Sequence, residues 1–388
     1  MSNRKVATHA VRQGLESDSQ FGAVVPPIYL STNYIFDDYR DPPQYDYGRG
    51  GNPTRNAVAD AINKLEGGAG AVMTSSGLAS ITLVVSLLKS DDLLVIPHDC
   101  YGGSYRLFTN LANKGHFKLA VVDQTNEQQL RAVFKDRPAM VWLETPSNPL
   151  LRIVDIGAIC QQAKAVDAKV VVDNTFLSPF GQQPLQLGAD IVIHSTTKYI
   201  NGHSDVIGGV AIANTEQLAE ELSWWANTLG LTGSPFDGYL TLRGLRTLGP
   251  RIRQHTENAQ ILVETLVNHP AVTKVYYPGL EDHPQHQLAK RQQNNFGAMI
   301  SFELIGGEDE VATLVGNLNE FCLAESLGGV ESLVCVPATM THRAMAPEAR
   351  LEAGVKDTLI RLSVGIEDSQ DLTADLTHAL DKVLETNK

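Results

Sequence analysis

Cysteine is scarce in this sequence, and long apolar runs are absent. Four cysteines occur among 388 residues, at irregular spacings and without a C-x-x-C pair: Cys100, Cys160, Cys322 and Cys335. This pattern favours free thiols in a reducing compartment over disulfides or a metal site. The longest apolar stretch, Ile81 to Leu88, is far too short to span a bilayer, and the N-terminus lacks the apolar segment of a signal peptide. These absences predict a soluble, cytoplasmic protein.

Basic side chains are also in deficit. The chain has 31 lysines and arginines against 44 aspartates and glutamates, a formal net charge of −13. This balance argues against a non-specific nucleic-acid binder and against docking on anionic membranes. It leaves small anionic substrates open, because a few arginines can dominate the potential of one pocket. We therefore expect small-molecule ligands, with no nucleic-acid or membrane partner.

The remaining composition is that of a folded protein. Apolar residues make up 43% of the chain and charged residues 19%, and the length suggests two or three domains. Residues 1–52 are rich in turn signals, such as Pro26-Pro27 and Pro42-Pro43, and have little core of their own. We expect this segment to be an arm that lies on another surface or another subunit.

From Pro53 onward, short apolar runs alternate with helical patterns, the first of them at Thr54–Glu66. Seven strands are expected at Ala71–Thr74, Leu93–Pro97, Leu119–Asp123, Met140–Glu144, Val170–Asp173, Ile191–Ser195 and Val206–Ala213. Their nearly continuous apolarity predicts an α/β fold with a mostly parallel seven-stranded sheet covered by helices. We expect this sheet in a large domain, 53–255, followed by a smaller α+β domain, 256–388.

Three polar motifs fall where predicted strands end, which is the edge where open α/β sheets bind ligands. Ser75–Leu78 follows the first strand and opens a helix, so its backbone N–H groups can face an anion. Asp173 ends a run of three valines, and Ser195, Thr197 and Lys198 lie at the end of a later strand. Taken singly, these are an ordinary turn, a capping carboxylate and a surface lysine.

Together, the three motifs match the needs of pyridoxal 5′-phosphate (PLP). This cofactor takes a lysine for covalent attachment, an acid beside its ring nitrogen and donors for its phosphate. The turn is not G-x-G-x-x-G, so a dinucleotide is not indicated. The cluster of Glu281, Asp282, His283 and His286 has metal-ligating side chains, but Pro284 and polar surroundings favour a surface loop. We therefore expect PLP as cofactor and no metal.

Longer motifs carry a resemblance to a known family. They are Tyr47–Arg49, Gly51–Arg55, Asp99–Gly103, Glu144–Pro149, Val172–Thr175, Ser195–Tyr199 and Leu323–Gly329. With them, the sequence resembles the Cys/Met-metabolism family of PLP-dependent enzymes over essentially its whole length. The resemblance implies PLP-dependent transferase fold type I, with PLP bound by residues 53–255 and an arm, 1–52, that reaches the neighbouring subunit. It also implies a homotetramer built as a dimer of dimers with shared active sites.

The resemblance implies a role for each matching residue. Lys198 attaches the cofactor and moves protons, Asp173 pairs with the ring nitrogen, and Tyr101 stacks on the ring. Arg361 clamps the substrate α-carboxylate beside Ser326. The phosphate is expected to be held by Gly77, Leu78, Ser195 and Thr197, joined by Tyr47 and Arg49 of the neighbouring subunit.

Within the family, the sequence is most similar to the synthases that catalyse γ-replacement in methionine biosynthesis by transsulfuration. Such a synthase converts O-succinyl-L-homoserine and L-cysteine to L-cystathionine and succinate. Arg106, one turn beyond the stacking tyrosine, is expected to bind the distal carboxylate, and Glu325 to lie near the amino-acid substrate. Methionine γ-lyases carry a cysteine where this chain has Gly103. Gly50 stands where these synthases have a second arginine, so the succinyl or acetyl preference is left open.

Other functions remain open on the sequence alone. They are a cystathionine γ-lyase, an O-acylhomoserine sulfhydrylase, and a scaffold that keeps the PLP fold without catalysis. The presence of Lys198, Asp173 and Arg361 argues against the scaffold.

Overall fold

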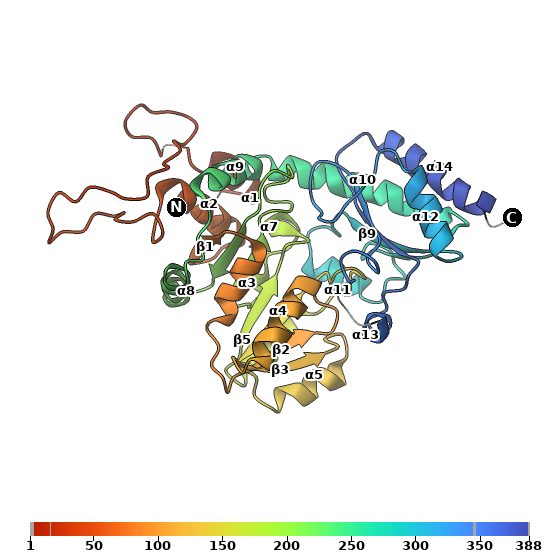
Figure 1. Cartoon of the computed structure of the whole chain (residues 1–388), viewed down its shortest axis with the longest axis horizontal. Coiled ribbons are helices and arrows are strands. Elements are labelled where there is room, and N and C mark those ends of the chain that lie inside the picture. The colour runs from red at the N-terminus through yellow and green to blue at the C-terminus, as the bar shows by residue number, and fades with distance from the viewer. Residues whose placement is uncertain (1–3, 16, 344–346, 387–388) are drawn as a thin grey trace.

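The computed structural model describes residues 4–15, 17–343 and 347–386. Figure 1 shows a looped N-terminal arm at the left, a large part around one sheet, and a smaller part at the right that carries the C-terminus. Within the described segments, no helix combines the length and the apolar composition needed to cross a bilayer. All four cysteines are free thiols.

The large part is built on a seven-stranded sheet with the order β1-β7-β6-β5-β4-β2-β3. Its strands are β1 (Gly70–Thr74), β2 (Leu93–Pro97), β3 (Lys118–Val122), β4 (Met140–Glu144), β5 (Lys169–Asp173), β6 (Ile191–Ser195) and β7 (Gly209–Ala213). Only β7 runs antiparallel to its neighbours, which confirms the mostly parallel sheet. β7 begins later than predicted, at Gly209, because the Gly208 N–H donates to Thr197 Oγ1 at 3.0 Å, outside the strand ladder.

Helices cover both faces of this sheet. They are α2 (Pro53–Glu66), α3 (Gly77–Val85), α4 (Gly102–Asn113), α5 (Glu127–Phe134), α6 (Ile156–Lys164), α8 (Glu216–Leu229) and α9 (Pro235–Leu245), with short turns α7 (Ser178–Gly181) and η1 (Pro184–Leu187). Apolar residues of α3, α4 and α8 pack on one face. The other face is covered by α2 and α9 and, further along the sheet, by α5 and α6. The sheet is therefore buried on both sides, as its continuous apolar strands require.

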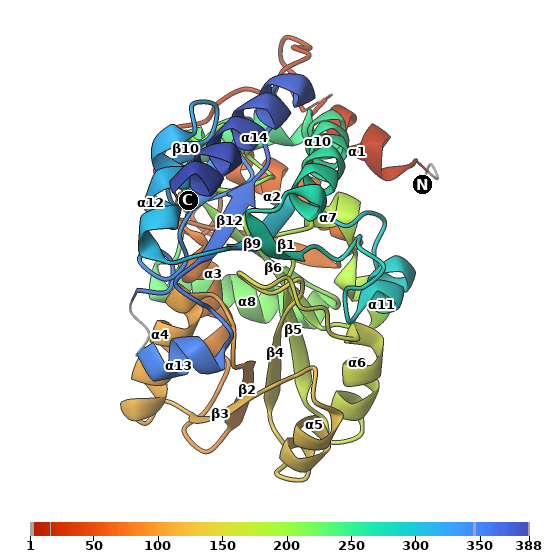
Figure 2. The ribbon, with the colours of Figure 1, turned by 90° about the vertical axis from the view of Figure 1, so that its right-hand side faces the viewer.

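The smaller part begins within one long helix, α10 (Leu248–Asn268), which runs without a break across the expected boundary at residue 255. It continues with β8 (Val272–Tyr276), α11 (His286–Gln292), β9 (Met299–Leu304), α12 (Glu308–Asn317), β10 (Cys322–Leu323), β11 (Leu333–Cys335), α13 (Pro347–Glu352), β12 (Leu359–Ser363) and α14 (Ser369–Thr386). The five strands form a second sheet in the order β10-β11-β12-β9-β8, and α10, α12 and α14 lie along it (Figure 2). One hydrophobic cluster joins this sheet to α2 and α9, so the two parts share a core.

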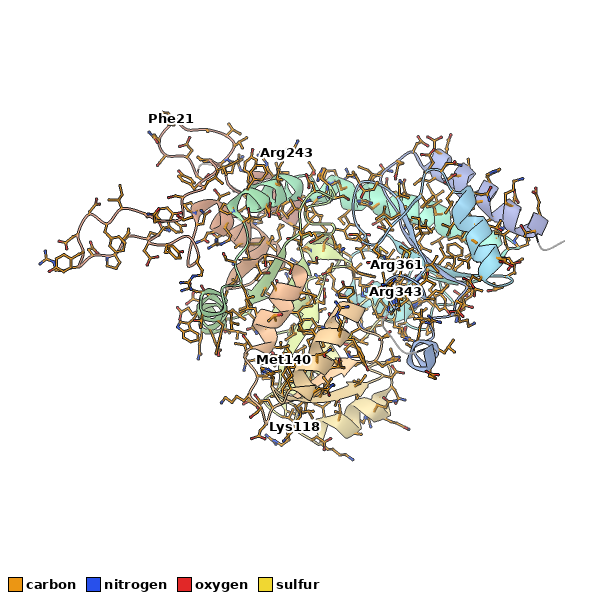
Figure 3. All side chains as sticks on the ribbon, in the orientation of Figure 1. Phe21, Lys118, Met140, Arg243, Arg343 and Arg361 are labelled. Atoms are coloured by element: carbon orange, nitrogen blue, oxygen red, sulfur yellow. The ribbon has the colours of Figure 1, made fainter. Side chains whose placement is uncertain are left out.

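The N-terminal arm differs in part from its prediction. Its first helix, α1 (Val6–Arg12), is anchored in the core through Ala10. The rest of the arm extends away from the body as loops (Figure 1). Phe21, Ile35 and Tyr39 are 82%, 88% and 86% exposed, and Phe21 lies at the far end of one loop (Figure 3). Large apolar side chains gathered on one exposed segment mark a surface suited to contact with another chain.

Candidate active site

A cavity of about 530 Å³ opens at the carboxyl ends of β1, β5 and β6, and the small part closes it. Ten of the residues singled out in the sequence line it: Gly77, Leu78, Tyr101, Asp173, Ser195, Thr197, Lys198, Glu325, Ser326 and Arg361. The first seven belong to the large part and the last three to the small part. The edge predicted from the strand ends is therefore the wall of a real cavity, and the site needs both parts.

Lys198 follows β6 and turns its amine toward the small part. Its Nζ donates a hydrogen bond to Ser326 Oγ at 2.6 Å. Burial, assisted by the positive charge of Arg361, lowers the pKa of Lys198 to about 8, and Glu325 opposes this shift. Near neutral pH a much larger fraction of this amine than of an ordinary lysine is consequently uncharged and able to act as a nucleophile or a base.

Two carboxylates end neighbouring strands at the floor of the cavity. Asp173 ends β5, lies in register with Glu144 at the end of β4, and accepts a hydrogen bond from the Thr175 N–H at 3.0 Å. Burial raises the pKa of Asp173, against the lowering effect of Thr175. Burial and the charge of Asp173 raise the pKa of Glu144 well above its usual range. A cationic group beside Asp173 would favour its charged form, as a protonated pyridine nitrogen does.

A cradle for an anion lies at the start of α3. Ser76 caps this helix by accepting a hydrogen bond from the Ala79 N–H at 3.1 Å. The first N–H groups of a helix have no partner within it and carry a positive partial charge. A Cβ on Gly77 would lie 2.9 Å from Ser195 Cβ, so only glycine permits this close approach. With the hydroxyls of Ser195 and Thr197 in the same wall, this turn fits a phosphate.

Arg361 lies on β12, in the interior of the molecule (Figure 3), and is only 2% exposed. Its Nη1 donates to Asn148 Oδ1 and its Nη2 to the Ser326 carbonyl, both at 2.9 Å. Its Nε is buried and has no hydrogen-bond partner among the described residues. The Ser326 backbone has a φ of 97°, and this residue serves both Arg361 and Lys198. A buried guanidinium with a spare donor fits the carboxylate of an amino acid.

Tyr101 is held at the cavity mouth by its own backbone and by a glycine. Its N–H donates to Glu144 Oε2 at 2.7 Å. A Cβ on Gly103 would lie 2.5 Å from Tyr101 Cε1, so the tyrosine ring fills the space a side chain would need. Burial raises the pKa of Tyr101, while the charge of Arg106 lowers it. Glu144 therefore fixes the backbone of Tyr101, and Gly103 leaves the space that the ring occupies.

Three predicted site residues do not line this cavity. Arg106 is exposed on α4, although its charge reaches Tyr101. Tyr47 and Arg49 lie on the arm, where the Arg49 guanidinium sits 5.6 Å from the Tyr47 ring centroid and donates to the Asn227 carbonyl at 2.6 Å. Their expected role was in a neighbouring subunit's site, and that role stays a prediction.

Several cavity residues received no role from the sequence. Ser76, Glu144, Asn148 and Thr175 fall within the quoted motifs, whereas Phe176 and Thr341 fall outside them. Glu144 ends an apolar strand as Asp173 does, so the rule that found Asp173 could have found it. Thr341 carries no such signal, because it follows no strand end and no motif.

The segment expected to be a surface loop is a turn with Glu281 and Asp282 exposed, but its two histidines are buried. His286 Nδ1 lies 2.9 Å from the Pro278 carbonyl, and His283 Nδ1 accepts from the Gln285 N–H at 3.2 Å. Both rings therefore hold the backbone of the segment before α11. No group of three or more His, Cys, Asp or Glu suited to a metal ion occurs among residues 4–15, 17–343 and 347–386.

The sequence matches the family described as Cys/Met metabolism PLP-dependent enzyme over residues 7–381. The chain belongs to this family. It is 57% identical over 374 residues to cystathionine gamma-synthase of Escherichia coli (strain K12). The matched region covers 96% of this chain and 97% of that protein. It is 47% identical over 377 residues to a cystathionine beta-lyase of Lactococcus lactis subsp. cremoris (strain MG1363), covering 97% and 99%.

A solved structure gives the same result for the fold. Cystathionine gamma-synthase from Xanthomonas oryzae pv. oryzae, in complex with aminoacrylate and cysteine, matches with a TM-score of 0.98 and 55% identity, covering 99% of this chain and 100% of that one. The predictions of family, fold type I and PLP as cofactor are confirmed. The low-pKa lysine, the carboxylate at the floor and the phosphate cradle fit this cofactor.

In the protein freed of cofactor, we expect the Lys198 amine to titrate near pH 8, because burial and Arg361 disfavour its charged form. Its reaction with an amine-acylating reagent should therefore accelerate up to about pH 8 and level off above about pH 9, whereas a model lysine accelerates up to about pH 10.4. Peptide mass spectrometry of Lys198 measures this rate. Glu325→Gln should shift the profile to lower pH, because it removes a charge that favours the ammonium form. A Lys198 profile like that of exposed lysines would contradict the prediction.

Proposed function

We propose that this protein is a γ-replacement enzyme that converts O-succinyl-L-homoserine and L-cysteine to L-cystathionine and succinate. The observation that carries the proposal is the arrangement of Lys198 and Arg361, which share Ser326 as a hydrogen-bond partner. It places a proton-accepting amine beside a clamp for an α-carboxylate. The high identity to two proteins named cystathionine gamma-synthase supports the choice of reaction.

The chain's own residues supply binding and proton transfer. PLP, when bound, withdraws electrons from the substrate Cα and stabilises the negative charge that develops there. Asp173 would hold the ring nitrogen in its charged form, and the cradle at α3 would hold the phosphate. Arg361 orients the substrate through its α-carboxylate, so that the Cα proton faces Lys198.

Lys198 then acts as the base of the reaction. Its uncharged Nζ, with the pKa lowered to about 8, takes the Cα proton, passes it to the bound substrate–cofactor pair, and then takes a proton from Cβ. Loss of the Cβ proton expels succinate from Cγ, and the thiolate of cysteine forms a new C–S bond at that carbon. Protons then return to Cβ and Cα, which leaves the amine uncharged again. Ser326 Oγ, 2.6 Å from Nζ, holds the amine on the substrate side of the cavity.

A second candidate function is cleavage of cystathionine by the same site. The 47% identity to a cystathionine beta-lyase favours keeping it. Arg106 is the residue that we expect to distinguish the two, because a cation near Tyr101 suits the distal carboxylate of a succinyl ester. Glu325 lines the cavity, and this supports the proposal that it meets the ammonium group of the second amino acid.

The product identifies the reaction. We expect the holoenzyme to form cystathionine from O-succinyl-L-homoserine and cysteine, measured by mass spectrometry, and to do so faster than it cleaves cystathionine. Lys198→Ala should abolish turnover and the visible absorption of the bound cofactor, because Lys198 carries the one side-chain amine among the described residues of the cavity wall. If the enzyme releases ammonia from cystathionine faster than it forms cystathionine, the result would favour the lyase. Retained turnover in Lys198→Ala would exclude both functions.

Gly50 provides a test of acyl preference. A Cβ at this position would meet only ordinary contacts, 3.6 Å from the Tyr47 carbonyl and 3.8–3.9 Å from the Asn227 amide, so a side chain fits. We expect Gly50→Arg to lower KM for O-succinyl-L-homoserine by about threefold to tenfold, as one partly exposed charge pair allows. KM for O-acetyl-L-homoserine, which lacks the distal carboxylate, should not change. Equal effects on both esters would contradict a role for this position in binding the succinyl group.

We also propose a cytoplasmic homotetramer, a dimer of dimers in which each arm completes a neighbour's phosphate site. The exposed apolar side chains of the arm support such a contact. The position of Tyr47 and Arg49 outside their own cavity supports it as well.

Mixed subunits test the shared site. Lys198→Ala and Arg49→Ala should each be nearly inactive alone. If the site is shared, a co-expressed mixture should recover about a quarter of wild-type turnover, because half of randomly paired dimers hold one intact site. Affinity tags on each variant allow the mixed species to be purified and assayed. Activity no higher than the sum of the single variants would show that Arg49 does not act in a partner's site.

A further inference from the structure

Two loops of the large part carry groups that face the substrate. The loop after β2 carries Tyr101, whose ring lies at the cavity mouth. The loop after β4 carries Asn148, which accepts a hydrogen bond from Arg361 Nη1 at 2.9 Å. The distance between the stacked ring and the carboxylate clamp therefore depends on how these two loops are held together.

Asp99 lies between the loops and is only 6% exposed. Its Oδ2 accepts from Ser147 Oγ, next to Asn148, at 2.7 Å, and from Arg152 Nη1 at 2.7 Å. Asp99 is itself two residues from Tyr101. One buried carboxylate oxygen thus joins the segment that carries the ring to the segment that carries the amide holding Arg361.

Arg152 extends this link to the small part. Its Nη2 donates to the Ala353 carbonyl at 3.0 Å, and its Nη1 also lies 3.1 Å from His98 Nε2. The same loop is tied to β9 by Ser301 Oγ, which donates to the Pro149 carbonyl at 2.6 Å. Arg152 therefore fixes Asp99 while touching the part of the chain on which Arg361 lies.

We propose that Asp99, with Arg152 as its counter-ion, is a positioning residue that sets the distance between Tyr101 and the Arg361 clamp. Neither side chain lines the cavity, so neither touches the substrate. A charged Asp99 is required, because its Oδ2 accepts two hydrogen bonds and one donor is a guanidinium. An asparagine amide at this position would face the two donors, Ser147 Oγ and Arg152 Nη1, in one of two orientations. It would present either a neutral oxygen, which accepts more weakly, or an N–H group, which cannot accept.

The test measures binding of an amino acid that has an α-carboxylate but no leaving group. L-Alanine, titrated against the visible absorption of the holoenzyme, reports the clamp without turnover. This titration requires only that the protein binds PLP as its family does, so its result is independent of the proposed γ-replacement. We expect Asp99→Asn and Arg152→Gln each to raise the Kd of L-alanine about tenfold or more, because small displacements of binding groups have large effects.

The matched control is Arg291→Gln. Arg291 Nη2 lies 3.0 Å from Asp155 Oδ2 and also joins the small part to the large part, but it does so at the N-cap of α6, three residues after Arg152, and not at Asp99. Its loss should leave the Kd of L-alanine within twofold of wild type. Ser147→Ala, which removes only one of the two contacts, should raise Kd less than Asp99→Asn does.

A double variant separates positioning from general loss of structure. If Asp99 and Arg152 act as one unit, Asp99→Asn combined with Arg152→Gln should raise Kd no further than Asp99→Asn alone. Cofactor content and the unfolding midpoint of the loaded protein should stay near those of Arg291→Gln. An unchanged Kd in the cofactor-loaded fraction of Asp99→Asn, or effects that multiply in the double variant, would overturn the proposal.

Discussion

The short contact between Lys198 Nζ and Ser326 Oγ joins the two halves of the site. Lys198 comes from the end of β6 and Ser326 from a turn of the small part, so neither half has a complete site alone. The shared hydrophobic cluster keeps this contact in place, because it continues from α2 and α9 into the small sheet. The boundary expected at residue 255 falls inside α10, which continues without a break from one part into the other.

Two cations, Lys198 and Arg361, line the cavity of an otherwise acidic chain. The net charge is −13, yet the ligands inferred for the site are a phosphate and carboxylates. Arg361 can meet a carboxylate because it is buried with a spare Nε, and its charge also lowers the pKa of Lys198. In the proposed reaction, one cation would therefore prepare both the binding of the substrate and the base that acts on it.

Much of this site was predictable from the sequence. Asp173 and Lys198 each follow a run of apolar residues, and the carboxyl ends of parallel strands meet at one edge. The sequence could not show that Glu144 would lie beside Asp173, since register and strand order are set by pairing of distant segments. The sequence also could not predict β10 and β11, because strands of two and three residues are too short to show a periodic pattern.

The glycines show where the site can change and where it cannot. Gly77 and Gly103 lie against Ser195 and Tyr101 so closely that any Cβ would collide with them. Gly50 meets nothing closer than 3.6 Å and lies on the exposed arm. Substitutions on the arm that change the binding of the substrate's distal end can therefore be made without disturbing the cofactor cradle. The chain is similar to both a synthase and a lyase, and the proposed roles would put the shared chemistry in the core and the selective groups at its edge.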